Sequence, residues 1–128
     1  MKRMQYVVAA LLASGSVGAW AATAQDESMI KLATQSGCVI CHPIDTGAKG
    51  PNGLAPIGPA WQDVAKRYKG DKDAAARLTQ TVLKGSNYYE SHWRGKASGV
   101  AMPPNAVAIS EPDARQLVQW ILNLPVKP

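Results

Sequence analysis

Cysteine is scarce in this chain, whose 128 residues contain only Cys38 and Cys41. A bridge between two cysteines this close together would close a loop too small to stabilise a fold by restricting the unfolded chain. No cysteine lies near the small-residue stretch 19–24, so a lipoprotein anchor is not indicated there. The two thiols therefore need a purpose other than a structural disulfide.

The N-terminal apolar stretch is too often interrupted to be a good membrane span, because serines and glycines occupy most of positions 14–18. Lys2 and Arg3 precede the apolar run 6–13, and 19-AWAATA-24 ends in small residues, which is the pattern of a secretory signal peptide. We expect residues 1–24 to be removed, with cleavage after Ala24 preferred to cleavage after Ala21. Residues 25–128 are then expected to form one exported domain with no stable membrane insertion.

Phenylalanine is absent, and neither sign of charge dominates. The formal net charge of +5 falls by two to +3 when Lys2 and Arg3 leave with the signal peptide. Such a mild charge does not predict a nucleic-acid-binding protein. A chain this short also buries a limited apolar core, so we expect a bound group to help fill the interior.

The two cysteines belong to 37-GCVICHP-43, where the next residue, His42, is one of two histidines in the chain. A thiol redox motif normally follows a strand, and no β-rich run precedes this one. Zinc would need Cys38, Cys41, His42 and the distant His92, and would leave His42 crowded against Cys41. C-x-x-C-H is the signal for covalent haem attachment, with two thioethers to the haem and the histidine beneath the iron. This interpretation gives every residue of the motif a purpose.

A haem attached in this way needs a second axial ligand if the iron is to carry electrons without binding a substrate. Met102 lies in 101-AMPPN-105, where two prolines stiffen the backbone after the sulfur, and we favour it as that ligand. The other methionine of residues 25–128, Met29, has the spacing of a helix core position. His92 lies in a polar and aromatic stretch and is expected on the surface.

No segment alternates convincingly as a strand, whereas four stretches have the spacing of amphipathic helices, which predicts an all-α fold. The expected helices and their inward residues are 26–35 with Met29, Ile30 and Ala33; from Pro59 to Gly70 with Trp61, Val64, Ala65 and Tyr68; 71–84 with Ala74, Ala75, Leu78 and Val82; and from Ser110 to Pro125 with Leu117, Val118, Ile121 and Leu122. Ser110 and Asp113 predict a capping pair at the start of the last helix. About four helices with long loops are thus expected to wrap a flat cofactor.

The combination of 37-GCVICHPID-45, 58-GPAWQDVAKRY-68, Trp93 and 101-AMPPNAVAIS-110 closely resembles the small bacterial class I cytochromes c, of the type found in denitrifiers. The resemblance covers nearly all of residues 25–128. It implies a cytochrome c fold around one haem c, with His42 as the proximal ligand of the iron and Met102 as the distal one. It also implies an electron-transfer protein, not an enzyme.

Three supporting contacts follow from the same resemblance. The Pro59 carbonyl would accept a hydrogen bond from the His42 ring and fix its orientation. Asn105 would hydrogen-bond near the Met102 sulfur, and the indole N–H of Trp93 would reach a haem propionate.

The chain departs from the family pattern in three places. Pro51, in 50-GPNGL-54, is a rival to Pro59, because the stretch between His42 and Gly58 is longer than in compact members. Thr81 stands where the family often has a basic residue against a propionate. The loop 86–101 is also long, and is either a docking surface for one partner or a tolerated insertion.

The leading expectation is a periplasmic electron carrier between a respiratory donor and a terminal reductase or oxidase, with redox proteins as partners. The alternative is a haem c subunit of a hetero-oligomeric periplasmic dehydrogenase, permanently docked through the loop 86–101. A ligand-binding haem sensor or peroxidase would need an open sixth position, against which the M-P-P-N segment argues. The expected contact patch comprises Val39, Ile40, Val100 and Ala101, ringed by Lys49, Lys66 and Lys96.

Overall fold

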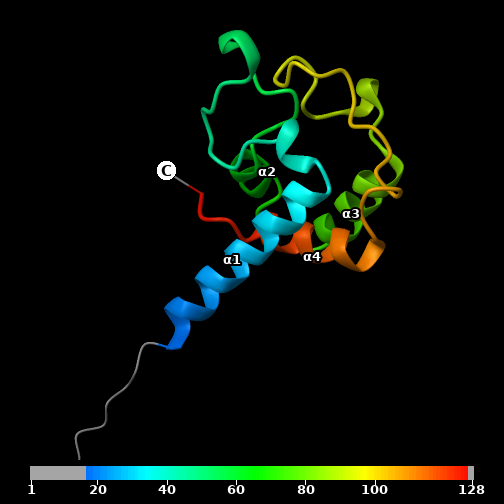
Figure 1. Cartoon of the computed structure of the whole chain (residues 1–128). Coiled ribbons are helices and arrows are strands. Elements are labelled where there is room, and N and C mark those ends of the chain that lie inside the picture. Colours follow the sequence, from blue (N-terminus) through cyan, green and yellow to red (C-terminus); the bar gives the residue numbers. More distant parts are fainter. Residues whose placement is uncertain (1–16, 127–128) are drawn as a thin grey trace, which may run out of the picture.

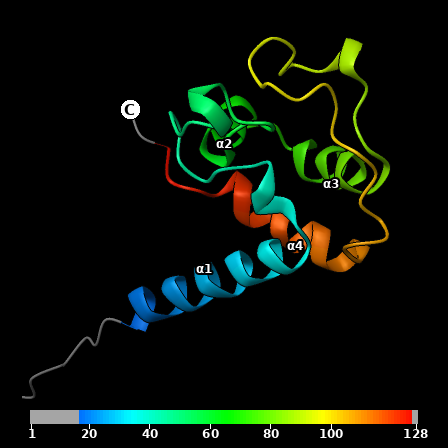
Figure 2. The same cartoon turned by 45° about the horizontal axis from the view of Figure 1, so that its top comes forward.

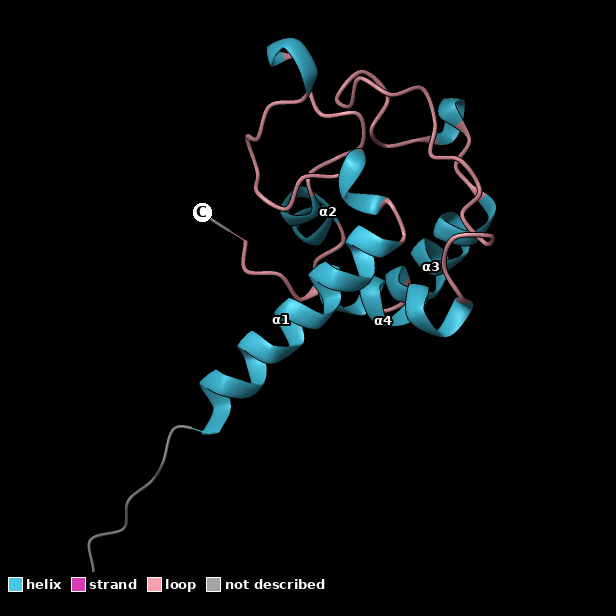
Figure 3. Ribbon diagram, viewed as in Figure 1, coloured by secondary structure: helices cyan, strands magenta, loops and turns pink. Residues whose placement is uncertain are grey.

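The structure is a computed structural model that describes residues 17–126, a range in which long loops join the helices and no strand occurs. The helices are α1 (Val17–Gln35), α2 (Trp61–Arg67), α3 (Ala74–Lys84) and α4 (Glu111–Leu122), with short 3-10 turns η1 (Cys38–Ile40), η2 (Pro51–Gly53) and η3 (Tyr88–Glu90). In Figure 3 most of the long loops lie above the four helices. The expected all-α class is confirmed, whereas the 3-10 turns were not predicted.

The first helix is longer than its sequence pattern indicates. It begins at Val17, not near Asp26, and its N-terminal half projects away from the rest of the molecule (Figures 1 and 2). The preferred cleavage point after Ala24 falls within this helix, and residues 1–16 of the predicted signal peptide lie outside the described residues. Within the described range, none of the helices combines the length and the apolar character needed to span a bilayer.

The inward face of α1 runs through Met29 and Ala33, which are 8% and 0% exposed. Ile30 was predicted to share this face, and that prediction is wrong, because its side chain is 39% exposed. Neighbouring positions on a helix differ in direction by about 100°, so the buried stripe passes through positions three and four residues apart. Leu32, three residues after Met29, is half-buried and packs against the core instead of Ile30.

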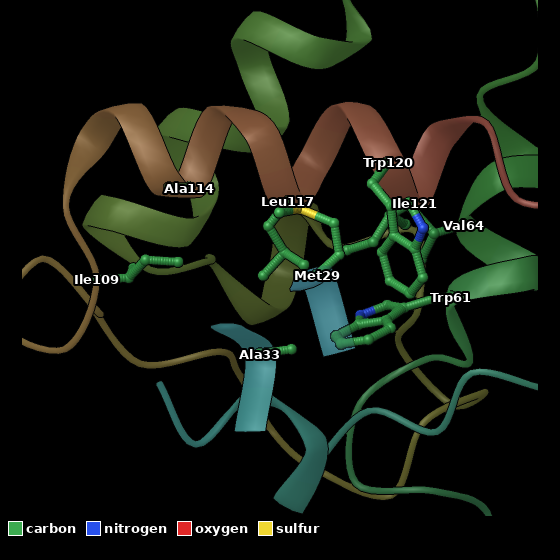
Figure 4. Close-up of a cluster of buried hydrophobic side chains, with 9 residues drawn as sticks. All are labelled: Met29, Ala33, Trp61, Val64, Ile109, Ala114, Leu117, Trp120 and Ile121. Atoms are coloured by element: carbon green, nitrogen blue, oxygen red, sulfur yellow. The ribbon is translucent and has the colours of Figure 1, made fainter. Parts of the chain in front are cut away.

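The core forms where α4 crosses the other helices, since α1, α2 and α3 all contact it. Figure 4 shows the cluster of buried apolar side chains, which are Met29, Ala33, Trp61, Val64, Ile109, Ala114, Leu117, Trp120 and Ile121. Trp61 and Trp120 meet edge to face, with ring centroids 5.8 Å apart and planes at 83°, an arrangement that adds to the free energy gained from burial. Leu117, Val118 and Ile121 are buried as predicted, and Leu122 is half-buried.

A hydrogen bond joins the first helix of the described chain to the last. The indole N–H of Trp120 in α4 donates to the Asp26 carboxylate in α1 over 2.7 Å. Trp120 is 7% exposed, and a buried indole N–H without a partner would cost free energy. The bond therefore fixes the first helix against the last.

The N-terminus of α4 carries the predicted capping pair. The backbone N–H of Asp113 donates to the Ser110 hydroxyl oxygen (3.3 Å), and the hydroxyl donates to the Asp113 carboxylate (2.7 Å). We expect Ser110→Ala to lower the free energy of unfolding by about 1 kcal/mol, because a backbone donor at the helix start loses its partner. Denaturant titration measures the change. Ser110→Thr keeps the hydroxyl and serves as control, so an equal loss in both variants would contradict the capping role.

Candidate haem site

The residues of the C-x-x-C-H motif share a single helical turn. Gly37, with φ of +75°, separates α1 from η1, and the backbone N–H groups of Cys41 and His42 both donate to the Cys38 carbonyl (3.2 and 3.1 Å). Both cysteines are free, half-buried thiols. Burial raises the pKa of Cys38 more than its backbone hydrogen bond lowers it, because desolvation disfavours the thiolate.

The His42 ring is fixed from several sides. Its Nδ1–H donates to the Pro59 carbonyl over 2.8 Å, and its plane stacks on Trp61 with centroids 6.0 Å apart and planes at 17°. A Cβ atom on Gly58 would lie 2.7 Å from both ring nitrogens. Burial lowers the pKa of His42, an effect that the hydrogen bond to Pro59 partly offsets. The neutral imidazole, the form that binds metals, is therefore favoured, with Nε2 free of the bond to Pro59.

The structure distinguishes the two candidate prolines. Pro51 lies exposed in η2, whereas Pro59 leads into α2 and makes the contact with His42. The backbone N–H of Gly58 donates to the Cys41 carbonyl over 2.8 Å. The segment before α2 is therefore attached to the cysteine turn at two neighbouring positions.

Met102 is held at its backbone by the end of α3. Its N–H donates to the Ser86 hydroxyl (2.8 Å), and its carbonyl accepts from the Ser86 backbone N–H (2.9 Å). Gly85 approaches so closely that a Cβ there would lie 2.9 Å from the Met102 carbonyl oxygen. The Met102 side chain is half-buried. Its backbone position is thus fixed by the element that precedes the long loop.

Asn105 also anchors this segment to α3, although not in the expected way. Its side-chain amide donates to the carbonyls of Pro103 (2.7 Å) and Val82 (3.3 Å), and its backbone N–H donates to Val82 as well (3.0 Å). An asparagine amide has two hydrogens, and both are used here by backbone carbonyls. In place of the expected bond toward the Met102 sulfur, the amide makes bonds that fix the segment 101–105 against α3.

Trp93 and the predicted lysines meet at one cavity of about 490 Å³. Its wall includes Pro59, Trp93 and the basic side chains of Lys49, Lys66, Arg67 and Lys96, with Asp63 as an acidic member. Trp93 is half-buried and packs against the core cluster. The three lysines that the sequence analysis grouped thus lie around a single hollow, beside the tryptophan expected to reach a haem propionate.

His92 is an exposed side chain on the wall of the same cavity, in agreement with its interpretation as a surface residue. The Lys96 ammonium donates to His92 Nε2 over 3.1 Å. Local desolvation lowers the pKa of His92, and the positive charges of Lys96 and Arg67 lower it further.

We expect Lys96→Gln to raise the pKa of His92 toward the ordinary value, because a neutral neighbour repels the imidazolium less. NMR titration of the ring protons measures the shift, and Lys31→Gln in α1 is the control. An unchanged pKa in Lys96→Gln would contradict the electrostatic coupling.

The apolar surroundings of this site suit a flat, mostly apolar cofactor. Several side chains pack against the core on one side and remain partly exposed on the other, namely Leu32, Ile44, Leu78, Val82, Leu83 and Trp93. Covering such surfaces is favourable in proportion to the apolar area removed from water. Within the described residues, no three His, Cys, Asp or Glu side chains are grouped so as to hold a metal ion by themselves. The two thiols, the neutral imidazole and this half-covered apolar surface fit a haem.

The family model described as cytochrome c matches residues 30–125. The chain therefore belongs to the cytochrome c family, and it carries one haem c attached covalently through Cys38 and Cys41. Its relatives are small electron-transfer cytochromes, and the chain is an electron-transfer protein of this kind, not an enzyme.

Particular relatives cover most of the chain. Cytochrome c-551 of Pseudomonas aeruginosa is 36% identical over 118 residues, which are 92% of this chain and 95% of that protein. Cytochrome c-552 of Hydrogenobacter thermophilus is 42% identical over 94 residues, 73% of this chain and 79% of that protein. The crystal structure of wild-type Nitrosomonas europaea cytochrome c552 superposes with a TM-score of 0.58 at 33% identity and covers 75% of this chain and 99% of that one. The expected cytochrome c fold is confirmed.

Sequence reasoning missed two supporting residues of the site. Gly58 makes room for the His42 ring, and its place directly before Pro59 in the quoted 58-GPAW-61 segment was a usable signal. Ser86 holds the Met102 backbone from 16 residues away. A lone serine after a helix carries no pattern that identifies so distant a partner.

Proposed function

We propose that His42 and Met102 are the two axial ligands of the haem and that the protein is a one-electron carrier. The observation that carries this proposal is the paired anchoring of the two residues. The His42 ring is oriented by the Pro59 carbonyl, and the Met102 backbone is held by two hydrogen bonds to Ser86. Ligands fixed by their surroundings keep the same geometry in both oxidation states, which favours fast electron transfer.

The haem supplies the one-electron chemistry of its iron, and the chain sets the conditions for that chemistry. The Pro59 carbonyl makes the His42 nitrogen a stronger donor, because it polarises the opposite N–H. A thioether from Met102 favours the reduced state relative to a second imidazole. With both residues in place, the chain leaves no position for oxygen or a substrate.

Partner proteins are proposed to dock where the cysteine turn and the loop 86–101 are exposed. Ile40 is 77% exposed, Val100 72% and Val39 37%, and the basic cavity residues lie on the segments that follow the turn and on the long loop. An apolar contact beside positive charge suits a redox partner with acidic residues near its own electron exit. The rate of reduction by such a partner should fall as ionic strength rises, whereas a flat dependence would remove the charged part of this proposal.

Residues 1–24 are proposed to be a signal peptide that takes the chain to the periplasm. The basic start and the small residues before Gln25 support this proposal. N-terminal sequencing of the exported protein tests it. A mature chain beginning at Gln25 or Ala22 agrees with one of the two expected cleavage points, and a chain that retains Lys2 contradicts export with cleavage.

The visible spectrum of protein expressed with haem-maturation machinery tests the ligand assignment. A sharp α-band in the reduced form, with the weak far-red sulfur-to-iron band in the oxidised form, is the expected result. Haem bands without the far-red feature would remove Met102 from the iron. Gel filtration of protein from its native source then separates a free carrier, which elutes alone, from the haem subunit of a dehydrogenase, which elutes with its partners.

A further inference from the structure

Two long loops meet beside the candidate haem site. One runs from the cysteine turn to Pro59, and the other is the loop 86–101 that ends at Met102. The backbone N–H of Ser98 donates to the Pro56 carbonyl, and the N–H of Gly99 donates to the Ile57 carbonyl, both over 2.9 Å. We call these two hydrogen bonds, formed by residues 56–57 and 98–99, the loop clasp. It joins segments that are otherwise separated along the chain by α2 and α3.

The clasp requires a glycine at position 99. A Cβ atom there would lie 2.6 Å from the Ile57 carbonyl oxygen and 3.0 Å from Ile57 Cγ2. The φ angle of Gly99 lies outside the left-handed region, so the backbone conformation itself would accept alanine. The absence of a side chain is therefore needed for close approach of the two loops and not for the turn geometry.

The clasp also completes a short connection between the two proposed axial ligands. Gly58 donates its N–H to the carbonyl of Cys41, the residue before His42. Ile57, the neighbour of Gly58, accepts from Gly99, and Gly99 precedes Met102 by three residues. Two hydrogen bonds and three short pieces of backbone thus link the histidine side of the site to the methionine side.

Without the clasp, Met102 would be held from α3 alone. Ser86 fixes its backbone from that side, but the preceding segment of the long loop carries exposed residues such as Val100. A segment with few buried contacts opens at low free-energy cost. The clasp ties this segment to Pro56 and Ile57, which directly precede the two residues that contact the His42 ring.

We propose that the loop clasp positions the iron ligand Met102. The absence of a side chain at Gly99 lets residues 56–57 hold the segment before Met102, which opposes dissociation of the Met102 sulfur from the iron. This inference rests on the proposed His42 and Met102 ligation. It assigns the enlarged loops a role within the molecule, whereas the sequence suggested only a docking surface or a tolerated insertion.

Gly99→Ala in the holoprotein tests the proposal. The new methyl group forces the loops apart and removes both hydrogen bonds, each of which shifts an equilibrium by about fivefold. Carbon monoxide binding to the reduced protein, which needs Met102 to leave the iron, should therefore accelerate by about tenfold or more. The far-red band of the oxidised protein should also disappear at a lower pH than in the unchanged chain. Ser98→Ala is the matched control, because it removes an exposed side chain and keeps the backbone donor.

The outcomes separate this inference from the proposed function. If the unchanged protein shows no far-red band, the Met102 assignment fails and the inference with it. If the band is present and Gly99→Ala loses thermal stability with unchanged carbon monoxide reactivity and unchanged pH behaviour, the clasp is merely structural and the inference is overturned.

Hydrogen exchange provides a test that needs no variant. In the unchanged holoprotein the amides of Ser98 and Gly99 should exchange at least about tenfold more slowly than that of Val100, which is not among the hydrogen-bond donors in the described part of the chain. Equal exchange at the three positions would show that the clasp does not persist in solution and would overturn the proposal, even if Gly99→Ala failed to fold.

Discussion

Replacing Met102 with alanine is expected to leave the haem attached and to abolish the far-red sulfur-to-iron band of the oxidised protein. Cys38 and Cys41 still form the thioethers, whereas the proposed distal sulfur is gone. The reduction potential should fall by on the order of 0.1 V or more, because axial ligands set haem potentials over a range of about 0.8 V. The reduced protein should also bind carbon monoxide at neutral pH. Absorption spectroscopy and potentiometric titration measure these changes.

Met29→Leu is the matched control for this variant. Met29 is the other methionine of residues 25–128, and it is buried in the core at 8% exposure. A change of similar volume there costs less than about 1.5 kcal/mol of stability and should leave the spectrum unaltered. Loss of the far-red band in Met29→Leu and its survival in Met102→Ala would reverse the assignment of the two sulfurs.

Gly58→Ala is expected to displace the proximal ligand. The added Cβ would lie 2.7 Å from both nitrogens of the His42 ring, and the backbone cannot easily withdraw, because the Gly58 N–H is bonded to Cys41 and the next carbonyl to His42. Overpacking of this kind costs about 1–3 kcal/mol. We expect a lower yield of holoprotein, an altered α-band and a shifted reduction potential, measured on purified protein.

Gly70→Ala distinguishes this steric effect from the general cost of changing a glycine. Gly70 has φ of +81°, and a Cβ there meets nothing within 4 Å. The substitution should lower stability by about 1 kcal/mol through backbone strain while leaving the haem spectrum unchanged. Identical spectra for Gly58→Ala and the unchanged protein would show that the His42 ring tolerates the added group.

The positions of the helices could be predicted because each repeats its apolar residues at helical spacing and has recognisable end signals. Ser110 and Asp113 indicated the start of α4, and α3 ends at Lys84, where the predicted range 71–84 also ends. The error at Ile30 arose because α1 buries a narrower stripe than α4, in which the adjacent Leu117 and Val118 are both buried. The sequence does not predict the extension of α1 to Val17, because the stretch before Asp26 is rich in small residues and has the pattern of a signal peptide.

The covalent and ligand positions of the site were predictable because they depend on residues adjacent in sequence. The C-x-x-C-H motif supplies two thiols and an imidazole from adjacent residues, and A-M-P-P-N supplies a thioether on a backbone stiffened by prolines. The contacts that orient these residues depend on tertiary structure instead. Asn105 illustrates the difference, since its amide was expected near a sulfur and is engaged by two backbone carbonyls, one of them on α3. The sequence around a residue such as Asn105 does not indicate which backbone carbonyl its side chain will contact in the folded protein.

The hydrogen bond between Asp26 and Trp120 has a consequence for the order of events during synthesis. The first helix cannot pack against α4 until nearly the whole chain has been made, because α4 lies near the C-terminus. Contacts between such distant segments form late, since closing a long loop must come first. Cys38 and Cys41 precede α4 in the chain, so both thiols stay accessible until the last helix packs against the first. An attachment enzyme that acts before the core closes would therefore meet both of them exposed.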